Sequence, residues 1–338
     1  MEPHSDLRLA LLNPWQRDFP LVREPFTHIA TTVGLSTDAV LAGYAQLQNE
    51  GALGRIGGVF AGNAGGAALL AAMAVPPERL DAVAAVVSSH PGVNHNYQRE
   101  YHYNLWFVMT GQDDTAVRAA MRSLEDATGL PALQLRMQRA YRIDLGFDLR
   151  GNTAPAPMAA AREATPVQGA DRPLAALLED GLPLVPRPYD AWAQALGRTP
   201  ESVLHTLQQW LDQGTVRRIG AIVRHHELGF DANAMTVFNI PDAEVDACGE
   251  ALARVTGVTL AYRRERTGGW PYNLYCMVHG RDRTAVRDVI ARVLDHCDLA
   301  QYPHEGLFSC RRFKQTGPRR FRALPETTMP EELDAVAG

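Results

Sequence analysis

Histidine side chains gather at two places in this sequence, and they are the residues best suited to proton chemistry. Six of the eleven histidines fall in two short windows, one in each half: His90, His95 and His102, then His225, His226 and His279. An imidazole has an ordinary pKa of about 6.5, so it exchanges protons near neutral pH, and it also binds iron. No HxxxH or HExxH spacing occurs, which disfavours a zinc site.

The surroundings of His95 depart from the pattern of a half-buried strand. Residues 93–99 predict a strand, but polar side chains stand where apolar ones should alternate. Such departures concentrate at functional sites, although an exposed sheet edge would also tolerate them. His102 follows on the next predicted strand, so the two imidazoles are expected to meet near one face of a hairpin.

The unit that positions these residues occurs twice. Three sequence anchors recur in the same order roughly 165 residues further along the chain. They pair Gly51–Gly57 with Gly214–Gly220, Val93–Arg99 with Val258–Arg264, and Tyr103–Trp106 with Tyr272–Tyr275. The second copy carries an insertion at 265–271, where Gly268-Gly269 predicts a hairpin turn.

The two copies differ in their chemistry. The strand of the second copy keeps Tyr262, Arg263 and Arg264 but has Leu260 and Ala261 and no histidine. One site built from both halves is therefore more economical than two equal sites. Arginines, tyrosines and imidazoles together suit a flat, aromatic, polyanionic ligand, because arginine binds carboxylates in pairs of hydrogen bonds.

Each copy opens with the pattern of a winged helix. In the first copy, residues 26–30 and 38–49 predict two helices around Gly34, with Ser36 as the N-cap and the glycine-flanked Arg-Ile-Gly segment as the wing. The second copy repeats this order with residues 189–196 and a helix that starts at Thr199-Pro200-Glu201.

Behind each winged helix, the order strand, helix, strand, strand, helix, strand predicts a ferredoxin-like αβ-sandwich. These elements are expected at 67–75, 77–89, 93–99, 103–110, 113–128 and 133–143, and at 233–240, 242–255, 258–264, 273–278, 283–296 and 305–313. A sheet with helices on one face leaves its other face to pair, so we expect an α+β internal pseudo-dimer of two tandem repeats. The expected boundaries are 1–60 and 61–150 for the first copy, a linker at 151–172, and 173–223 and 224–325 for the second.

Composition restricts the class of protein. The 338 residues, 46% of them apolar, suffice for several packed domains, and a net charge of −5 gives no general attraction to nucleic acid or membrane. Four cysteines without CxxC spacing disfavour a zinc ribbon or a disulfide framework, and neither a signal peptide nor a membrane span is evident. A cytoplasmic protein is expected.

The architecture resembles the Lrp/AsnC family of transcription regulators, which implies DNA binding. The predicted recognition helices argue against it, because residues 36–50 and 200–213 contain neither lysine nor arginine and carry acidic side chains. The basic residues at 311–322 lie outside the helix-turn-helix. We expect no DNA partner.

Longer motifs carry a more specific resemblance. GRIGGVF, HPGVNHNYQREYHYNLWFV, RRIGAIVRHHELGFDANAM and WPYNLYCMVHG are similar to the motifs of the siroheme decarboxylases, which are Lrp-like proteins that usually work as two related polypeptides. The resemblance implies both subunit types in one chain, which removes carbon dioxide from the C12 and C18 acetates of siroheme without a redox cofactor. Many relatives are expected to have a cysteine where this chain has Ala261, so that cysteine is not essential here.

Roles for individual residues follow from the chemistry that such a decarboxylation requires. We expect His95 and His102 to transfer protons and position the substrate, with His225 or His226 as an alternative acid or iron ligand. Carboxylate-binding residues are expected to be Arg55, Arg99, Arg218, Arg263 and Arg264, with Tyr97, Tyr262 and Tyr272 lining the pocket. The only iron is that of the siroheme or related tetrapyrrole, and pseudo-dimers could form a homo-oligomer. A heme- or tetrapyrrole-responsive regulator and an Lrp-like amino-acid sensor are the alternatives.

Overall fold

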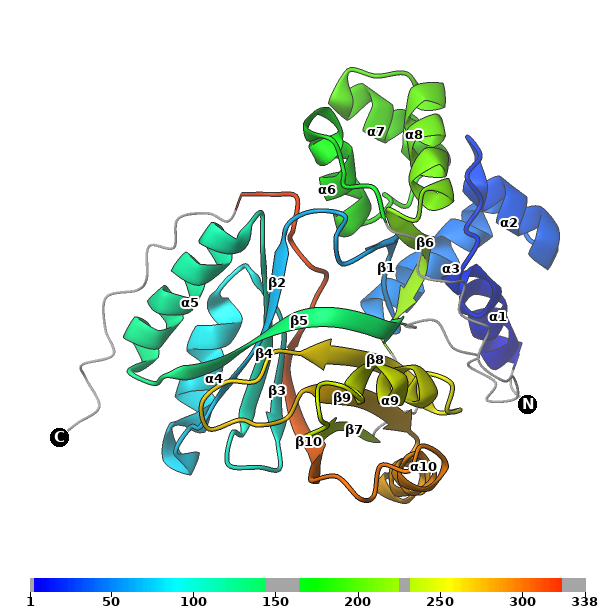
Figure 1. Ribbon diagram of the computed structural model, residues 1–338. Coiled ribbons are helices and arrows are strands. Elements are labelled where there is room, and N and C mark those ends of the chain that lie inside the picture. Colours follow the sequence, from blue (N-terminus) through cyan, green and yellow to red (C-terminus); the bar gives the residue numbers. More distant parts are fainter. Residues whose placement is uncertain (1–2, 144–163, 225–231, 324–338) are drawn as a thin grey trace.

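The structure, a computed structural model, describes residues 3–143, 164–224 and 232–323. Within these ranges the chain forms a pair of winged helices at one side and a large αβ unit at the other (Figure 1). His225 and His226, two of the expected site residues, lie outside the described residues.

The helix-turn-helix predictions are confirmed in both copies. The first contains α2 (Pro25–Val33) and α3 (Thr37–Asn49), and the second contains α7 (Pro188–Leu196) and α8 (Pro200–Asp212). The expected N-cap residues act as such, because the Ser36 hydroxyl accepts a hydrogen bond from the Ala39 amide and the Thr199 hydroxyl accepts one from Ser202. Gly34 and Gly197 end the first helix of each copy in the left-handed conformation.

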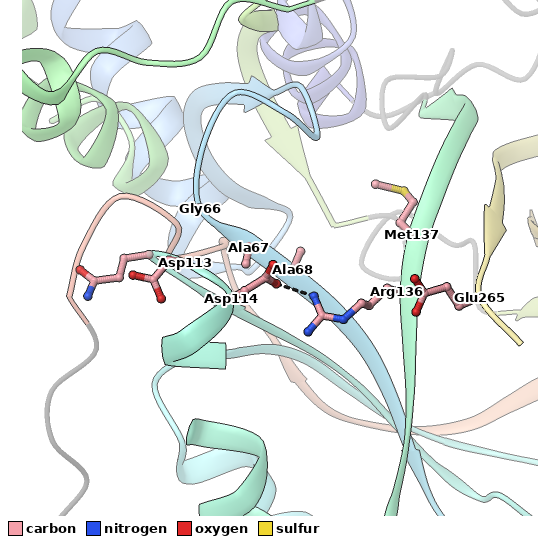
Figure 2. A pocket seen from close by; sticks show the side chains of 9 residues that line it. Gly66, Ala67, Ala68, Asp113, Asp114, Arg136, Met137 and Glu265 are labelled. Carbon is pink, nitrogen blue, oxygen red and sulfur yellow. Dashed lines mark hydrogen bonds and ion pairs between the residues drawn. The ribbon is translucent and has the colours of Figure 1, made fainter. Parts of the chain in front are cut away.

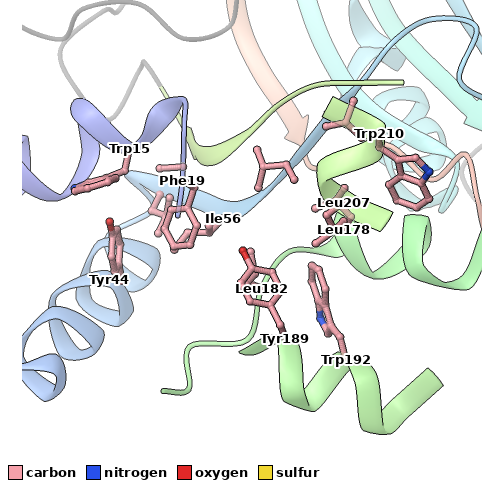
Figure 3. Packing of buried hydrophobic residues seen from close by; sticks show 14 of the residues in the cluster. Trp15, Phe19, Tyr44, Ile56, Leu178, Leu182, Tyr189, Trp192, Leu207 and Trp210 are labelled. Atoms are coloured by element: carbon pink, nitrogen blue, oxygen red, sulfur yellow. The ribbon is translucent and has the colours of Figure 1, made fainter. Parts of the chain in front are cut away.

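The two winged helices share one hydrophobic core. Their wings, β1 (Leu53–Phe60) and β6 (Val216–Val223), pair with each other in an antiparallel sheet in which Gly57 lies opposite Gly220. Aromatic and aliphatic side chains of both copies pack around it, among them Tyr44, Ile56, Tyr189 and Trp210 (Figure 3).

Additional helices flank this core that the sequence analysis did not predict. They are α1 (Pro3–Leu12), the short η1 (Pro14–Gln16) and η3 (Gly169–Asp171), and α6 (Arg172–Asp180). The expected linker thus ends in structured residues, since Ala164 is buried in the shared core and the Val167 amide donates to the Ala64 carbonyl.

Both αβ domains have the expected order of elements. The first contains β2 (Ala67–Met73), η2 (Pro77–Arg79), α4 (Leu80–Ser89), β3 (Val93–Arg99), β4 (Leu105–Gly111), α5 (Asp114–Thr128) and β5 (Ala132–Ile143). The second contains β7 (Ala232–Phe238), α9 (Val245–Leu252), β8 (Val258–Arg264), β9 (Leu274–Gly280), α10 (Arg283–His296) and β10 (His304–Gln315). The hairpin turn predicted at Gly268-Gly269 is present, because Thr267 and Trp270 form a β-bridge around Gly269, whose φ is +80°.

The eight strands form one closed barrel in the order β10, β3, β4, β2, β5, β8, β9, β7. Closure depends on two long strands, since β5 pairs with β2 and then with β8, and β10 pairs with β7 and then with β3. Helices α4 and α5 cover the outside of one half, and α9 and α10 cover the other (Figure 1). The inward face of each sheet thus faces the other sheet.

Two cations fasten these crossings at equivalent places. Arg142 near the end of β5 donates to the Ala253 carbonyl at 2.9 Å, just after α9. Lys314 near the end of β10 donates to the Ser88 carbonyl at 2.7 Å in α4. Each closing strand is therefore anchored at the first α-helix of the opposite αβ domain, α9 for β5 and α4 for β10.

Candidate active site

His95 lies on the barrel interior, at the end nearest the wings. It pairs with Val108 across β3 and β4, and its Nδ1 lies 3.1 Å from the amide oxygen of Asn94. Because that oxygen accepts, the neutral ring carries its proton on Nδ1 and its lone pair on Nε2. Burial, together with the charge of Arg55, lowers the pKa of His95 to about 4. The side chain is nevertheless only half-buried, so part of its surface stays accessible.

Arg55 lies on the wing strand β1, and its charge acts on His95. A Cβ atom added at Gly317 or Gly57 would come within 2.9 Å or 3.2 Å of its guanidinium, and one at Gly181 would come within 2.9 Å of its Cβ. Its buried Nε has no hydrogen-bond partner among the described residues. A half-buried cation with an unused donor beside a histidine is suited to an arriving carboxylate.

Tyr97 and Arg99 continue the inward face of β3. The guanidinium of Arg99 donates to the Leu307 carbonyl at 2.9 Å and lies 5.7 Å from the Tyr97 ring centroid. Burial lowers the pKa of Arg99 to about 10, which leaves it charged at neutral pH. Two cations that the sequence analysis did not select, Arg224 and Arg312, also act on Tyr97 by opposing the rise of its pKa that burial causes.

The side chains at the equivalent positions of β8, in the second half, are held by contacts with other protein groups. Arg264 donates to the Leu135 carbonyl at 2.7 Å and covers the Tyr262 ring at 4.6 Å. Trp270, from the insertion, is 1% exposed and donates to the Tyr275 hydroxyl at 2.7 Å. Tyr272 packs on Trp270 with ring centroids 4.8 Å apart. This half of the interior is packed with aromatic side chains rather than lined by free polar groups.

His279 is an interior histidine that the site predictions did not include. It lies on β9 with Nδ1 2.9 Å from the Thr259 hydroxyl, and burial lowers its pKa to about 4, with the charge of Arg99 adding to the effect. Strand alternation was the sequence signal that could have found His279, because it places this residue on the inward face of β9, opposite Asn233.

Three of the expected site residues lie away from His95. His102 does not lie on the second hairpin strand, which begins only at Leu105, and its side chain is exposed in the turn. Arg263 points outward and donates to Asp242 at 3.2 Å. Arg218 donates to the main-chain carbonyl of Gln16. The expectation that His95 and His102 meet is therefore wrong, because the turn separates them.

A cavity of about 550 Å³ lies elsewhere, between the start of β2, the start of α5 and β5 (Figure 2). Asp113, Asp114 and Glu265 line it, and its one cation, Arg136, pairs with Asp114. An acidic lining repels a polycarboxylate, so this cavity does not suit the ligand expected from the arginines around His95.

The described residues contain no group of three or more metal-binding side chains that could hold an ion. Among the helices that the structure describes, none has the length and apolar content needed to cross a membrane.

Comparison with known families supports the two-repeat organisation. The AsnC-like ligand binding domain matches residues 63–142 and 227–314. The siroheme decarboxylase NirDL-like HTH domain matches residues 9–53 and 171–217. Each model thus matches once in each copy.

Individual relatives match nearly the whole chain. The siroheme decarboxylase NirDL subunit of Paracoccus denitrificans is 41% identical over 93% of this chain and 97% of its own length. The siroheme decarboxylase of Hydrogenobacter thermophilus is 30% identical over 95% of this chain and 96% of its own. A crystal structure of a siroheme decarboxylase NirDL in complex with an iron-uroporphyrin III analogue aligns with a TM-score of 0.67 at 26% identity, over 94% of this chain and 95% of that one.

Proposed function

The chain belongs to the siroheme decarboxylase family, and we propose that it removes carbon dioxide from the C12 and C18 acetates of siroheme in front of His95. The observation that supports this location is the pairing of a half-buried, unbonded Arg55 with an accessible interior histidine. Both halves of the chain contribute, because Arg55 comes from a wing, His95 from the first sheet and Arg224 from the end of the second wing.

Recognition of the substrate depends on charge. Siroheme carries several carboxylates around a flat ring, and Arg55, Arg99, Arg224 and Arg312 surround His95 and Tyr97. Bidentate hydrogen bonds from arginine suit carboxylates, and a tyrosine face suits the flat ring. Five other residues remain candidates for substrate binding from the sequence analysis, although each already contacts other protein groups. They are Arg218, Arg263, Arg264, Tyr262 and Tyr272.

The chemistry requires protons but no net electron transfer. Protonation of the pyrrole carbon lets the ring accept the electron pair of the breaking bond, and carbon dioxide leaves. The exocyclic CH₂ group that remains becomes a methyl when it gains a proton and the ring carbon loses the proton it had taken up. One proton is consumed for each carboxylate lost, so the reaction is redox-neutral and we propose no resident cofactor.

His95 supplies that proton after substrate binding. Its low pKa keeps the empty site neutral at pH 7, and negative charge arriving with the substrate raises that pKa toward the neutral range. Its Nε2 then takes up a proton and delivers it to the ring carbon. His225 and His226 remain proposals for a second acid or an iron ligand.

The regulator alternative fits the winged helices poorly. The wings are paired with each other, and α3 and α8, which would be the recognition helices, contain no lysine or arginine to contact DNA phosphates. We propose that the helix-turn-helix units cover the wing end of the site and bind no DNA. We also propose that the two copies form an internal pseudo-dimer.

An anaerobic assay with siroheme tests the proposal. The product should be lighter by two carboxyl groups, with carbon dioxide released in equal measure, and DNA should have no effect on the rate. Unchanged substrate mass in an assay where a known siroheme decarboxylase is active would overturn it.

A further inference from the structure

Glu179 is a buried carboxylate close to the candidate site. It lies near the end of α6, is 3% exposed, and its Oε2 accepts from the Arg320 amide at 2.9 Å and the Phe321 amide at 3.3 Å. These amides belong to residues 316–322, which follow β10 and which we name the strap. The strap starts beside the site, because the Thr316 amide donates to the Asn94 carbonyl at 2.7 Å.

Glu179 and Arg55 form an incomplete pair. The other oxygen of Glu179, Oε1, is buried without a hydrogen bond and lies 4.0 Å from Nε of Arg320, and Nε of Arg55 is also buried without a hydrogen bond. The negative charge of Glu179 opposes the burial that lowers the pKa of Arg55, so the two charges interact without a direct bond. Gly317 of the strap lies close to both residues, because an added Cβ there would stand 2.9 Å from Arg55 Nη1 and 3.4 Å from the main-chain carbonyl oxygen of Glu179.

The repeat contains a second, equivalent pair that is bonded. Gln16 occupies the position equivalent to Glu179, and Arg218 the position equivalent to Arg55, so each pair joins one copy to the other. In the second pair, Arg218 donates to the Gln16 main-chain carbonyl. Of the two pairs, only the one near His95 has a carboxylate, and only there does the arginine make no hydrogen bond to its partner.

We propose that Glu179 is an exchangeable counter-ion of Arg55: a substrate carboxylate takes its place beside the guanidinium, and Glu179 then takes up a proton. This inference rests on the proposed function, since it requires a polyanion in front of His95. Glu179 is a positioning residue in this account, because it acts on the substrate through Arg55.

The charges around Glu179 are consistent with such an exchange. Burial is the largest influence and raises the pKa of Glu179 to about 7, while Arg320, the strap amides and Arg55 oppose the rise. Asp180 acts on Arg55 from the next position but pairs with Arg322 at the surface. A substrate carboxylate adds negative potential, which raises the pKa of Glu179 further and favours its protonated form.

The size of the effect follows from the fraction of protein that is ready to bind. If binding needs protonated Glu179 with a pKa of about 7, the apparent Kd rises about tenfold between pH 6 and pH 8. In Glu179→Gln the side-chain oxygen can still accept the strap amides, but it cannot titrate. This variant should bind more tightly than the wild type at pH 8 and lose that tenfold dependence.

Iron-uroporphyrin III, an iron tetrapyrrole with eight carboxylates, is a suitable probe because its absorption spectrum reports binding. We would titrate the full chain, Glu179→Gln and Asp180→Asn at pH 6, 7 and 8. Calorimetry at pH 8 in two buffers of different ionisation enthalpy counts the protons taken up. Asp180→Asn removes the same charge one position away and should keep the wild-type pH dependence.

The inference is supported if wild type and Asp180→Asn share the tenfold dependence and the proton uptake, and Glu179→Gln lacks both. Equal dependence and uptake in all three proteins would overturn it while leaving the proposed function intact. If Glu179→Gln does not fold, absence of proton uptake by the wild type alone would still overturn it. A wild type that neither binds the probe nor decarboxylates siroheme would overturn the proposed function as well.

Discussion

Replacing His95 with alanine tests the proton-donor role most directly. In the empty protein, the pKa of His95 is about 4, so roughly one imidazole in a thousand is protonated at pH 7. One substrate carboxylate about 5 Å away, at an effective dielectric constant of about 20, interacts with the imidazolium by about 3 kcal/mol. Since each pKa unit corresponds to about 1.4 kcal/mol, this raises the pKa by about two units.

Two pH profiles should therefore differ. The profile of kcat/KM reports the free protein and should fall above pH of about 4, whereas that of kcat reports the complex and should fall about two units higher. The sign follows from the need for the protonated form of the acid. In His95→Ala the fall at high pH should disappear from both profiles. Turnover should drop by at least about tenfold, since a general acid typically contributes about 10²–10⁴-fold.

The assay is the anaerobic conversion of siroheme, followed by product mass between pH 4 and pH 9. His296→Ala is the control, because His296 is exposed on α10 and contacts the Arg292 carbonyl and the Asp295 carboxylate, both in its own helix. Unchanged turnover in His95→Ala, or a pH profile of this variant that still falls as in the wild type, would refute the reasoning and assign the acid role to another histidine.

The remaining predictions concern binding and stability. Arg55→Gln should weaken binding of iron-uroporphyrin III by about tenfold or more in an absorption titration, because a charge-assisted hydrogen bond contributes about 1.5–3 kcal/mol; affinity equal to wild type would remove Arg55 from the site. Lys314→Met should lower the free energy of unfolding in urea by about 1–3 kcal/mol, since the Lys314 amine donates to the Ser88 and His90 carbonyls; no change would mean that these two hydrogen bonds do not stabilise the barrel. Trp270→Ala should lower the free energy of unfolding by about 3–5 kcal/mol in the same measurement, because it leaves a cavity in the aromatic cluster inside the barrel; a loss below about 1 kcal/mol would contradict that packing.

Local sequence signals predicted most of the elements. Helix boundaries agree within a residue or two where a capping side chain marks them, as at Ser36 and Thr199. The helix expected at 242–255 is shorter, because α9 begins at Val245 after turn residues that follow Pro241. Helices α1 and α6 were missed because they are short, at 10 and 9 residues, and depend on packing against the shared core, which local sequence does not show.

The candidate site was harder to predict, because strand alternation decides which neighbours a side chain meets. His95, Tyr97 and Arg99 share the inward face, as their spacing of two residues implies. The same rule places Arg263 outward and leaves Arg264 inside, although both were predicted to bind carboxylates. His279 obeys the rule as well, but the sequence marks it only as a histidine near the end of a strand.

The sequence by itself determined the repeat, the two kinds of domain in each copy and the family, because these depend on local periodicity and on motifs that stay within one copy. Only the tertiary structure decided which of the two equivalent arginines remains unbonded. Arg55 and Arg218 occupy the same place in the repeat, but Arg218 donates to the Gln16 carbonyl, whereas Arg55 lies close to Gly57, Gly181 and Gly317 and interacts electrostatically with Glu179 and His95. Except for Gly57, those neighbours are distant in sequence, and barrel closure and wing pairing bring them together.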